Sequence, residues 1–431
     1  MRAPYRLVRS VLALALLAGT AVVSAGCVAQ EKPTLVVLGP WTGGEAIPFE
    51  KMLKEMGRQK GRNYVYEGTR SLRETLVAQL RTESPPDVAI LNGPGELAQY
   101  ARDGDAQPLP SKVAGRAIEP WAPRITVPDK HGNMEQRAYW APVRVDLKSI
   151  VWSRPGEEKA GAEDARWCLG MASGATSGWP GTDWIEDLLL QREGPDVYER
   201  WATGALGWTD KRVKRAWQDW AAVLATDVEN AEEAITIPFE SLGGGKSGLL
   251  NRGDCTREHQ GAFVRRHYGL DVMPAPTSDF VEGLPADQNV FEVSGDMAAV
   301  FKPSDAAWEL VLELTSSDAQ DEWGEAAKAG EQPFFPTGTG GTKGATPASE
   351  EVRRMLNGAE RICLDASDAM PSTLRGAFQR AVLEFLENPL DEAVLDGLLG
   401  QLEAERLLQK GAGAFVLDDL CDVPPGTSSA G

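Results

Sequence analysis

The chain has 431 residues, of which 42% are apolar and 25% charged, a composition typical of a soluble globular protein long enough for two domains. Its formal net charge of −19 argues against a protein that holds nucleic acid by charge, because such proteins need a basic surface. We interpret the acidity as a solvated surface that keeps an exported protein in solution.

Residues 1–26 differ from the rest and predict an export signal peptide. Three arginines precede the apolar run VLALALLAGTAVV, which is short for a membrane-spanning helix of the mature chain. The signal ends in VSAGC, which resembles a bacterial lipobox, so Cys27 is expected to become the lipidated first residue and 27–32 a tether. Ordinary cleavage and release is the alternative, because Ser24 stands where leucine is commoner. No other apolar run approaches about 18 residues.

Cys27 is followed by four cysteines, and outside the cytoplasm an even number favours disulfides. Four cysteines allow three pairings, of which we predict Cys168–Cys255 and Cys363–Cys421; free buried thiols are the alternative. No pair has C-x-x-C spacing and the histidines do not cluster with cysteine, so no metal site is predicted.

Strand and helix patterns alternate after the tether. The run TLVVLG predicts a buried strand, and FEKMLKEMGRQ repeats apolar residues at helical spacing. NYVYEG and DVAIL predict two more strands, each followed by a helical pattern, LRETLVAQLRT and ELAQYARDG. This order predicts an α/β fold with an open, mostly parallel sheet, in which ligands bind beyond the carboxyl ends of the strands.

A second block begins with YWAPVRVDLKSIVW, which predicts an extended crossing segment. Helical patterns follow in TDWIEDLLLQREG, VYERWATG and KRVKRAWQDWAAVLAT, then an extended GLDVMPAP, and mostly helices as far as about Lys410. The segment GGGKS at 243–247 lacks the first glycine of a phosphate loop, since Glu240 stands there. HExxH and GxSxG motifs are absent, so no nucleotide or other cofactor is predicted.

Six segments, spread in order over nearly the whole chain after Cys27, carry a family resemblance when taken together: GPWTGGEAIPFEKML, YEGTR, PPDVAILNGPGELAQYARDG, YWAPVRVDLKSIVW, SGWPGTDWIEDLLLQREGPDVYERW and LDASDAMP. They resemble the extracellular solute-binding proteins of ABC transporters, and more narrowly the group that binds alpha-glucosides and related sugars.

The resemblance implies a type II periplasmic-binding-protein-like fold, in which two α/β lobes joined by hinge strands close on a sugar. We place the crossings near Pro142–Lys148, Asp271–Pro276 and Phe335–Gly340. The expected division is 1–26 signal peptide, 27–32 lipidated tether, 33–143 plus 277–335 lobe 1, 144–276 plus 336–420 lobe 2, and 421–431 C-terminal tail.

The resemblance also implies the partners. These are the permease subunits of an ABC transporter, a small carbohydrate, and the lipid bilayer through Cys27. We expect a monomer anchored at the extracellular face of the cell membrane, without a cofactor and without nucleic acid.

Sugar recognition needs flat rings that cover C–H faces and planar polar groups that pair hydroxyls. Glycines and a helix N-terminus behind the first strand expose amides, beside an indole ring. Each candidate also has a structural alternative: Trp41 in the core, a plain turn at Asn92, a surface ion pair for Arg70 and helix capping by Asp296. The expected ligand-binding residues are Trp41, Thr42, Gly43, Gly44, Arg70, Asn92, Gly93, Trp179, Asp183, Trp184, Gly295, Asp296, Asp368 and Met370.

The last four of these residues come from the resemblance, as counterparts of family segments at the cleft. Arg144 and Asp146 lie in the first crossing, where they either touch ligand or pair with each other. Lys302 and Pro303 stand where relatives often have aromatic residues, which leaves a smaller, more polar or charged solute open.

Two other functions remain open. Paired carboxylates can hydrolyse glycosides, but no motif favours an enzyme here. The fold can also serve a lipoprotein that acts as a sensor or scaffold.

Overall fold

The computed structural model describes residues 34–128, 131–156, 166–226, 228–240, 248–285, 289–336 and 345–425. The expected signal peptide, Cys27 and the 27–32 tether lie outside the described residues, as do the GGGKS segment and residues 337–340 of the third expected crossing. Among the described residues, no helix combines the length and the apolar character needed to cross a bilayer.

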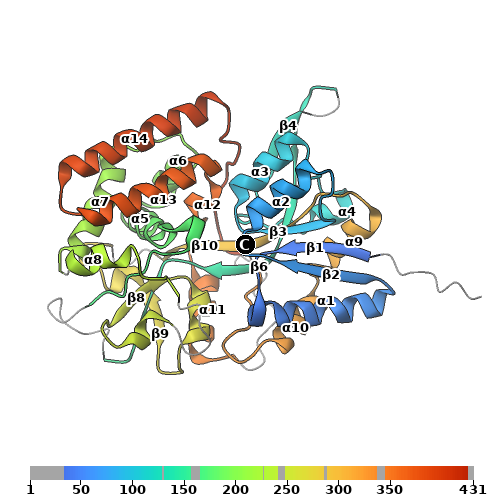
Figure 1. The fold of residues 1–431 in the computed structure, drawn as a ribbon, viewed down its shortest axis with the longest axis horizontal. Coiled ribbons are helices and arrows are strands. Elements are labelled where there is room, and N and C mark those ends of the chain that lie inside the picture. Colours follow the sequence, from blue (N-terminus) through green and yellow to red (C-terminus); the bar gives the residue numbers. More distant parts are fainter. Residues whose placement is uncertain are drawn as a thin grey trace, which may run out of the picture.

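A single seven-stranded sheet extends through both halves of the molecule (Figure 1). Its order is β12-β11-β10-β3-β1-β2, and β6 pairs with β10 off this path. The strands are β1 (Thr34–Gly39), β2 (Asn63–Gly68), β3 (Val88–Leu91), β6 (Trp140–Leu147), β10 (Val290–Val300), β11 (Arg361–Leu364) and β12 (Cys421–Asp422).

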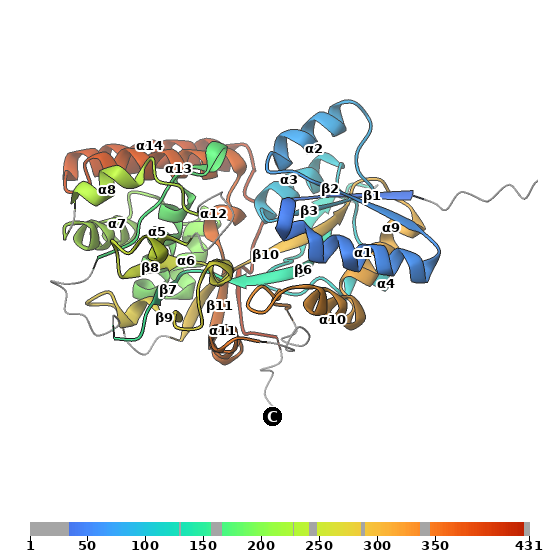
Figure 2. The same cartoon turned by 60° about the horizontal axis from the view of Figure 1, so that its bottom comes forward.

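Strand β10 is the element that both lobes share. Its first residues pair in parallel with β11, and its last residues pair antiparallel with β3. Strand β6 lies antiparallel along it, from Leu147 opposite Val293 to Trp140 opposite Ala299, with a register shift between Asp296 and Met297. The two lobes are therefore joined through a pair of long hydrogen-bonded strands, which Figures 1 and 2 show between them.

Lobe 1 is built on the predicted parallel strands, since β1 pairs in parallel with both β2 and β3. Helices α2 and α3 cover one face of the sheet, and α1 and α10 the other (Figure 1). The α/β prediction is confirmed here. The lobe contains η1 (Gly43–Glu45), α1 (Ala46–Lys60), α2 (Leu72–Arg81), α3 (Pro94–Asp103), α4 (Ser111–Ala114), β4 (Ile125–Pro128), β5 (Met134–Arg137), α9 (Asp305–Leu314) and α10 (Ser317–Ala326).

Helix α1 illustrates how the pattern specifies the element. Phe49, Met52, Leu53 and Met56 recur at helical spacing and are all buried against the sheet. The helix ends at Gly61, whose φ of 67° is left-handed and favours glycine.

Lobe 2 surrounds helix α5, which is buried along almost its whole length. A separate sheet of order β8-β7-β9 lies beside it. The elements of lobe 2 are β7 (Ile150–Ser153), η2 (Gly174–Thr176), α5 (Trp179–Glu193), α6 (Pro195–Ala202), α7 (Lys211–Leu224), α8 (Val228–Ala234), η3 (Leu249–Arg252), β8 (Arg257–Gln260), η4 (Ala262–His267), β9 (Met273–Pro276), η5 (Thr277–Asp279), α11 (Pro347–Gly358), α12 (Ala366–Ala369), α13 (Ser372–Glu387) and α14 (Glu392–Gly411).

Both predicted disulfides are present. Cys168 is bonded to Cys255, 87 residues away, and Cys363 to Cys421, 58 residues away. The second bond joins β11 to β12, where the two cysteines are directly opposite. Cys421 therefore belongs to the sheet, and the expected tail from residue 421 begins two residues later.

The second expected crossing, at Asp271–Pro276, is wrong. Met273–Pro276 form β9, which among the described strands pairs with β7 alone, at the edge of the lobe 2 sheet, where prolines lose no ladder hydrogen bond. The chain instead returns to lobe 1 through β10. The first expected crossing coincides with β6, and near the third Phe334 bridges to Val145 on β6.

Candidate ligand-binding site

Two cavities lie between the lobes and adjoin each other. The β10 cavity, of about 280 Å³, is lined by Ser294–Asp296 of β10, by Pro40 and Trp41 directly after β1, and by residues of α5 and α12. The α10 cavity, of about 360 Å³, is lined by Trp323 of α10 and by Ala327, Lys328, Gly330, Glu331, Pro333 and Phe334, which follow the helix. Both are lined by Glu45, Arg70, Arg144, Asp146, Glu240, Phe263 and Arg266.

Trp179 provides the aromatic surface of the β10 cavity. It begins α5 and is half-buried, and Phe239 meets its ring edge-on at 4.9 Å between centroids. Lys148 Nζ lies 4.9 Å from the centre of the ring. Trp179 can therefore offer an apolar ring edge or face to a ligand beside an ammonium group.

Trp41 lines the same cavity, but the structure does not leave its ring free. Its side chain is 2% exposed and packs against Phe49 and Trp323, with ring centroids 4.7 and 5.0 Å away. The Arg144 guanidinium lies 4.9 Å from its ring centre. The expectation of Trp41 as a stacking platform is therefore corrected: it packs in the lobe 1 core and supports Arg144.

Most of the expected ligand-binding residues come together in the two cavities, although they come from distant parts of the sequence. The expected residues that line a cavity are Trp41, Thr42, Gly44, Arg70, Asn92, Trp179, Asp183, Gly295, Asp296 and Asp368.

Four expected residues line neither cavity. Trp184 is 1% exposed and stacks on His259 at 4.2 Å, because its face of α5 points into the lobe 2 core. Met370 is 1% exposed, and its carbonyl lies close to α3. Gly93 is buried where a Cβ would meet Arg375 at 2.8 Å, and Gly43 is exposed with a left-handed φ of 56°.

An ion pair crosses the cleft where the two cavities meet. Arg266 of lobe 2 lies 2.9 Å from Glu45 of lobe 1, and also 2.6 Å from Glu240. Arg70 lies 3.2 Å and Arg144 3.7 Å from the same Glu45 carboxylate. Burial acts to raise the pKa of Glu45, but the charges of Arg266, Arg144 and Arg70 outweigh it and lower that pKa.

Glu240 is held as a carboxylate in the same way. Burial acts to raise its pKa, but hydrogen bonds from His267 and Arg266 and the charge of Arg266 lower it to about 2. His267 Nε2 lies 2.9 Å from Glu240 Oε2. This carboxylate therefore stays ionised and keeps Arg266 directed toward Glu45.

Arg144 and Asp146, the two charged residues of the first crossing, do not pair with each other. Arg144 Nε donates to Asp296 Oδ2 at 2.6 Å, its cross-strand neighbour on β10. Asp146 Oδ1 is buried and has no hydrogen-bond partner within the described residues. Burial raises the pKa of Asp146 to about 6, although Arg265, Arg144 and Lys148 act to lower it.

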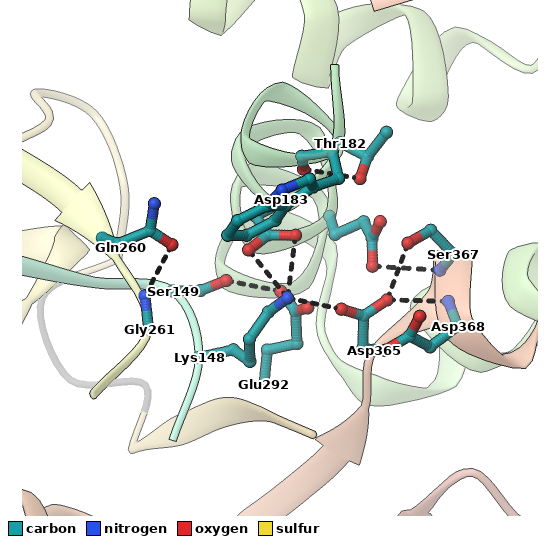
Figure 3. Close-up of polar contacts among 12 residues, drawn as sticks. Lys148, Ser149, Thr182, Asp183, Gln260, Gly261, Glu292, Asp365, Ser367 and Asp368 are labelled. Carbon is teal, nitrogen blue, oxygen red and sulfur yellow. Dashed lines mark hydrogen bonds and ion pairs between the residues drawn. The ribbon is translucent and has the colours of Figure 1, made fainter. Parts of the chain in front are cut away.

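A buried charge cluster supports the lobe 2 wall (Figure 3). Lys148 Nζ lies 2.9 Å from Asp183 and 2.8 Å from Asp365, and Ser149 donates to Glu292 at 2.5 Å. Burial acts to raise the pKa of Asp365, but Lys148 and hydrogen bonds from Ser367 and Asp368 lower it to about 2.

The same cluster contains the acids that could hold a metal ion. Carboxylate oxygens of Asp183, Glu292 and Asp365 lie within 4.8 Å of one another. The Lys148 ammonium already neutralises two of them, so these acids anchor a lysine. Asp183, expected to accept a sugar hydroxyl, is 1% exposed and engaged in this way.

The sequence analysis did not single out several cleft residues, namely Glu45, Glu240, Phe239, Phe263, Arg265, Arg266, His267 and Phe334. Glu45 directly follows Gly43 and Gly44, and it is an acidic residue in the first turn of a helix. That position was a signal from which it could have been selected. The run RRH at 265–267 was the other available signal, since adjacent basic residues there have no neighbouring acid in sequence.

No family model matches the chain. It is 26% identical over 386 residues to the alpha-glucosides-binding periplasmic protein AglE of Rhizobium meliloti strain 1021, covering 82% of this chain and 83% of that protein. It is 25% identical to the osmoprotective compounds-binding protein GgtB of Synechocystis, covering 83% and 89%. A shorter match, 24% identical over 44% of this chain, is to an ABC transporter extracellular-binding protein of Pyrococcus horikoshii. The chain is thus similar, over more than four fifths of its length, to two solute-binding proteins.

Solved structures share the two-lobed fold of this chain. The bacterial solute receptor AcbH, which prefers β-D-galactopyranose, superposes with a TM-score of 0.63 at 10% identity over 88% of this chain and 99% of that one. The raffinose complex of RafE gives 0.62 at 10% identity, over 86% and 99%. These relatives and neighbours are named as binding proteins or solute receptors rather than as enzymes.

Proposed function

We propose that the protein captures a carbohydrate between its lobes and delivers it to the membrane permease of an ABC transporter. The observation that carries the proposal is the cleft itself. It combines half-buried rings of Trp179, Phe239 and Phe263 with charged and amide groups from both lobes. Rings beside planar polar groups match a ligand that has apolar C–H faces and hydroxyl edges.

The relatives support the same class of ligand. AglE is named for alpha-glucosides, and the structural neighbours include receptors for galactopyranose and raffinose. We assign ring contact to Trp179 and hydroxyl contacts to Asn92, Arg70 and Asp296, with Asp146 as an additional acceptor. Asp368 and the Gly295 backbone complete the proposed contacts in the β10 cavity.

Capture requires the lobes to close. A ligand that touches both walls binds only the closed form well, and so shifts the population toward it. The strands β6 and β10 are the proposed hinge, and the Arg266–Glu45 ion pair is a contact of the closed form.

We also propose how the chain divides into lobes and where the protein lies in the cell. Lobe 1 comprises residues up to about 143 together with the part of β10 that pairs with β3 and helices α9 and α10, and lobe 2 the rest. Cys27 carries the lipid that tethers the protein at the extracellular face. The permease subunits are the protein partners of a monomer.

Thermal unfolding of the purified protein with a panel of sugars tests the function. The panel is glucose, maltose, maltotriose, galactose, melibiose, raffinose and trehalose, with glycine betaine and spermidine as non-sugar solutes. A ligand that binds only the folded form raises Tm, by an amount that corresponds to about 2.7 kcal/mol at 100 times its Kd. An increase with at least one sugar is expected. A response to the non-sugar solutes alone would contradict the carbohydrate assignment.

A matched pair of variants ties any response to the cleft. Asn92→Ala changes an exposed residue that lines the β10 cavity, whereas Gln99→Ala changes an exposed residue of α3 that lines neither cavity. The first should reduce the sugar-induced rise in Tm and the second should leave it unchanged. Cells that lack the protein distinguish a transporter component from a sensor. Loss of a transporter component abolishes sugar uptake, whereas loss of a sensor leaves uptake intact.

A further inference from the structure

The buried charge cluster of lobe 2 contains more acids than bases. Its five carboxyl groups are all buried, and its two cations are Lys148 and Arg375; the carboxyl groups are those of Asp183, Glu186, Glu292, Asp365 and Asp368. A buried carboxyl group without a matching cation takes up a proton rather than remaining charged. The cluster therefore holds protons at neutral pH, and their number depends on how the two cations are shared.

Asp368 is the least buried acid of this cluster, and it lines the β10 cavity. It lies beside Asp365 (Figure 3), to which its backbone N–H donates at 2.8 Å. Burial raises the pKa of Asp368 to about 7, and the charge of Asp365 acts in the same direction, whereas Arg375 and Lys148 act to lower it. Asp368 therefore changes between its neutral and ionised forms near neutral pH.

Arg375 connects Asp368 to the opposite lobe. It lies on α13 of lobe 2, and its Nη1 donates to Asp368 Oδ1 at 3.0 Å. Its Nη2 lies 3.7 Å from Oε2 of Glu96, which belongs to α3 of lobe 1. The Tyr100 hydroxyl of the same helix donates to Glu96 Oε1 at 2.7 Å, so Glu96 moves with lobe 1. One guanidinium is thus shared by carboxyl groups of both lobes.

The two lobes touch backbone to backbone beside this shared arginine. A Cβ added to Gly95 of α3 would lie 2.3 Å from the carbonyl oxygen of Met370, directly after α12. These helices follow β3 and β11, whose carboxyl ends point toward each other along β10, because β3 is antiparallel and β11 parallel to it. Separation of the lobes about β10 withdraws Glu96 from Arg375, and closure restores the contact.

Closure changes the charges around Asp368 in one direction. The Glu96 carboxylate approaches and shares the cation that stabilises ionised Asp368, and a nearby like charge disfavours that form. The other charged groups that face Asp368 all belong to lobe 2, so lobe motion does not separate them from it; they are Asp365, Lys148 after β6, and Asp183 of α5. Closure therefore favours the neutral carboxyl group.

We propose that closing the lobes on a sugar transfers a proton from the solvent to Asp368, with Arg375 as the positioning residue that couples this carboxyl group to Glu96 of lobe 1. The proton leaves water or buffer and is bound by a carboxylate oxygen of Asp368, and opening of the lobes returns it. This inference rests on the proposed function and adds that sugar binding depends on pH. Affinity rises as the pH falls from about 8 toward 6.5, since protons favour the state that binds more of them.

Calorimetric titration in two buffers of different ionisation enthalpy counts the protons. Titrations of the purified protein at one pH, about 7.5, in phosphate and in Tris would use glucose, maltose, maltotriose, galactose, melibiose, raffinose and trehalose as probes. For a sugar that binds, we expect an uptake of roughly 0.3–0.8 proton, and an affinity that rises by roughly two- to sixfold for each unit decrease in pH.

Three variants assign the proton. Asp368→Asn removes the carboxyl group and should abolish the uptake. Glu96→Gln removes the lobe 1 charge at a residue that lines neither cavity, and should reduce the uptake by about half or more. Asp103→Asn changes an exposed acid at the end of the same helix that also lines neither cavity, and should leave the uptake unchanged.

Each other outcome has a definite meaning. Equal binding enthalpies in the two buffers, proton release, or full uptake in Glu96→Gln would overturn the inference while the sugar-binding function stands. Uptake that is kept in Asp368→Asn and lost in Asp146→Asn would also overturn it, because the proton would then belong to the other carboxyl group. Binding of none of the sugars would overturn both. If Asp368→Asn does not fold, Glu96→Gln and its control still decide the question.

Discussion

Arg266 Nη1 lies 2.9 Å from Glu45 Oε1, and this contact joins η4 of one lobe to η1 of the other across the cleft. Glu240 holds the Arg266 guanidinium from behind at 2.6 Å, so the arginine belongs to lobe 2 and reaches toward lobe 1. The pair is broken whenever the lobes separate. It therefore contributes to the free energy of closure rather than to the stability of either lobe.

Glu45→Gln should make the closed form open faster. The partly exposed pair is worth about 1 kcal/mol or less, so the dissociation rate of a bound sugar should rise by up to about fivefold. Stopped-flow tryptophan fluorescence measures this rate. Glu55→Gln, which removes an exposed ion pair with Arg58 inside lobe 1, is the control and should leave the rate unchanged. An unchanged rate in Glu45→Gln would show that the pair is absent from the bound state.

Asp146→Asn should stabilise the ligand-free protein above pH 6. The Asp146 carboxyl has a pKa of about 6 in the folded chain and 3.8 as its ordinary value. The unfolded chain ionises first, so folding loses free energy as the pH rises from 3.8 to 6. The asparagine variant avoids this loss and should be more stable by roughly 1–3 kcal/mol at pH 7.5, but not at pH 3.5.

Urea unfolding at the two pH values measures the effect, and Asp418→Asn, at an exposed position, is the control. The same variant should bind sugar less tightly at pH 7.5, because the ionised carboxylate is the better acceptor. A stability difference that is equal at both pH values would mean that Asp146 is not the titrating group.

Lys148→Met should be among the most destabilising single changes in lobe 2. It removes the cation that lies 2.9 and 2.8 Å from Asp183 and Asp365 and leaves buried carboxylates without a partner. Breaking a buried pair in this way costs about 3–5 kcal/mol. Lys148 holds the pKa of Asp365 at about 2 against 3.8, so this part of the stability is present above pH 3.8 and is lost as the pH falls toward 2.

Denaturant unfolding of Lys148→Met should therefore show a large loss at pH 7.5 and a smaller one below pH 4. Lys328→Met, whose side chain is 84% exposed, serves as the control and should change the free energy of unfolding by less than about 0.5 kcal/mol. A similar loss from both lysines would argue that the cluster is not energetically coupled to Lys148.

Trp41→Ala and Trp179→Ala should separate stability from binding. Trp41 is buried among aromatic rings, and its truncation should cost about 3–5 kcal/mol of unfolding free energy. Trp179 is half-buried at the cavity wall, and its truncation should cost about 1–3 kcal/mol of sugar affinity with a smaller change in stability. Calorimetry and urea unfolding of both variants provide the comparison, which a reversed pattern would contradict.

Removal of either disulfide should weaken the fold measurably. The bonds close segments with separations of 87 and 58 residues, for which chain entropy predicts about 4–5 kcal/mol each and mutants usually show about 2–5. Cys168→Ser with Cys255→Ser, and Cys363→Ser with Cys421→Ser, can be compared by urea unfolding. Free thiols in the denatured, unreduced protein would show that the bonds do not form.

The parallel start of the fold was predictable because its signals are local. TLVVLG, NYVYEG and DVAIL are apolar runs between helical periods, and the rule for ligand position in open sheets then directed attention to Trp41 and Asn92. The pairing of β10 with both β3 and β11 was not predictable in this way, because it joins segments far apart in the chain. The segment MPAP at 273–276 was expected to be a crossing between the lobes, because prolines are compatible both with an edge strand and with an extended crossing segment.

The charged residues of the site could not be predicted from the sequence, for a related reason. Arg144 and Asp296 are 152 residues apart, and no spacing rule connects them. Whether Trp41 or Trp179 shows its ring to the cleft depends on neighbours such as Arg144 and Trp323, which only the folded chain brings together.

Strand β3 has β1 on one side and β10 on the other, and the β10 residues it needs are Met297–Val300. During synthesis from the N-terminus, more than two hundred residues follow β3, including most of lobe 2, before the β10 residues that close this edge are made. Until then an unpaired strand edge is open to other chains, which is a known route to aggregation. The time between synthesis of β3 and of β10 is therefore the interval in which this protein is most vulnerable.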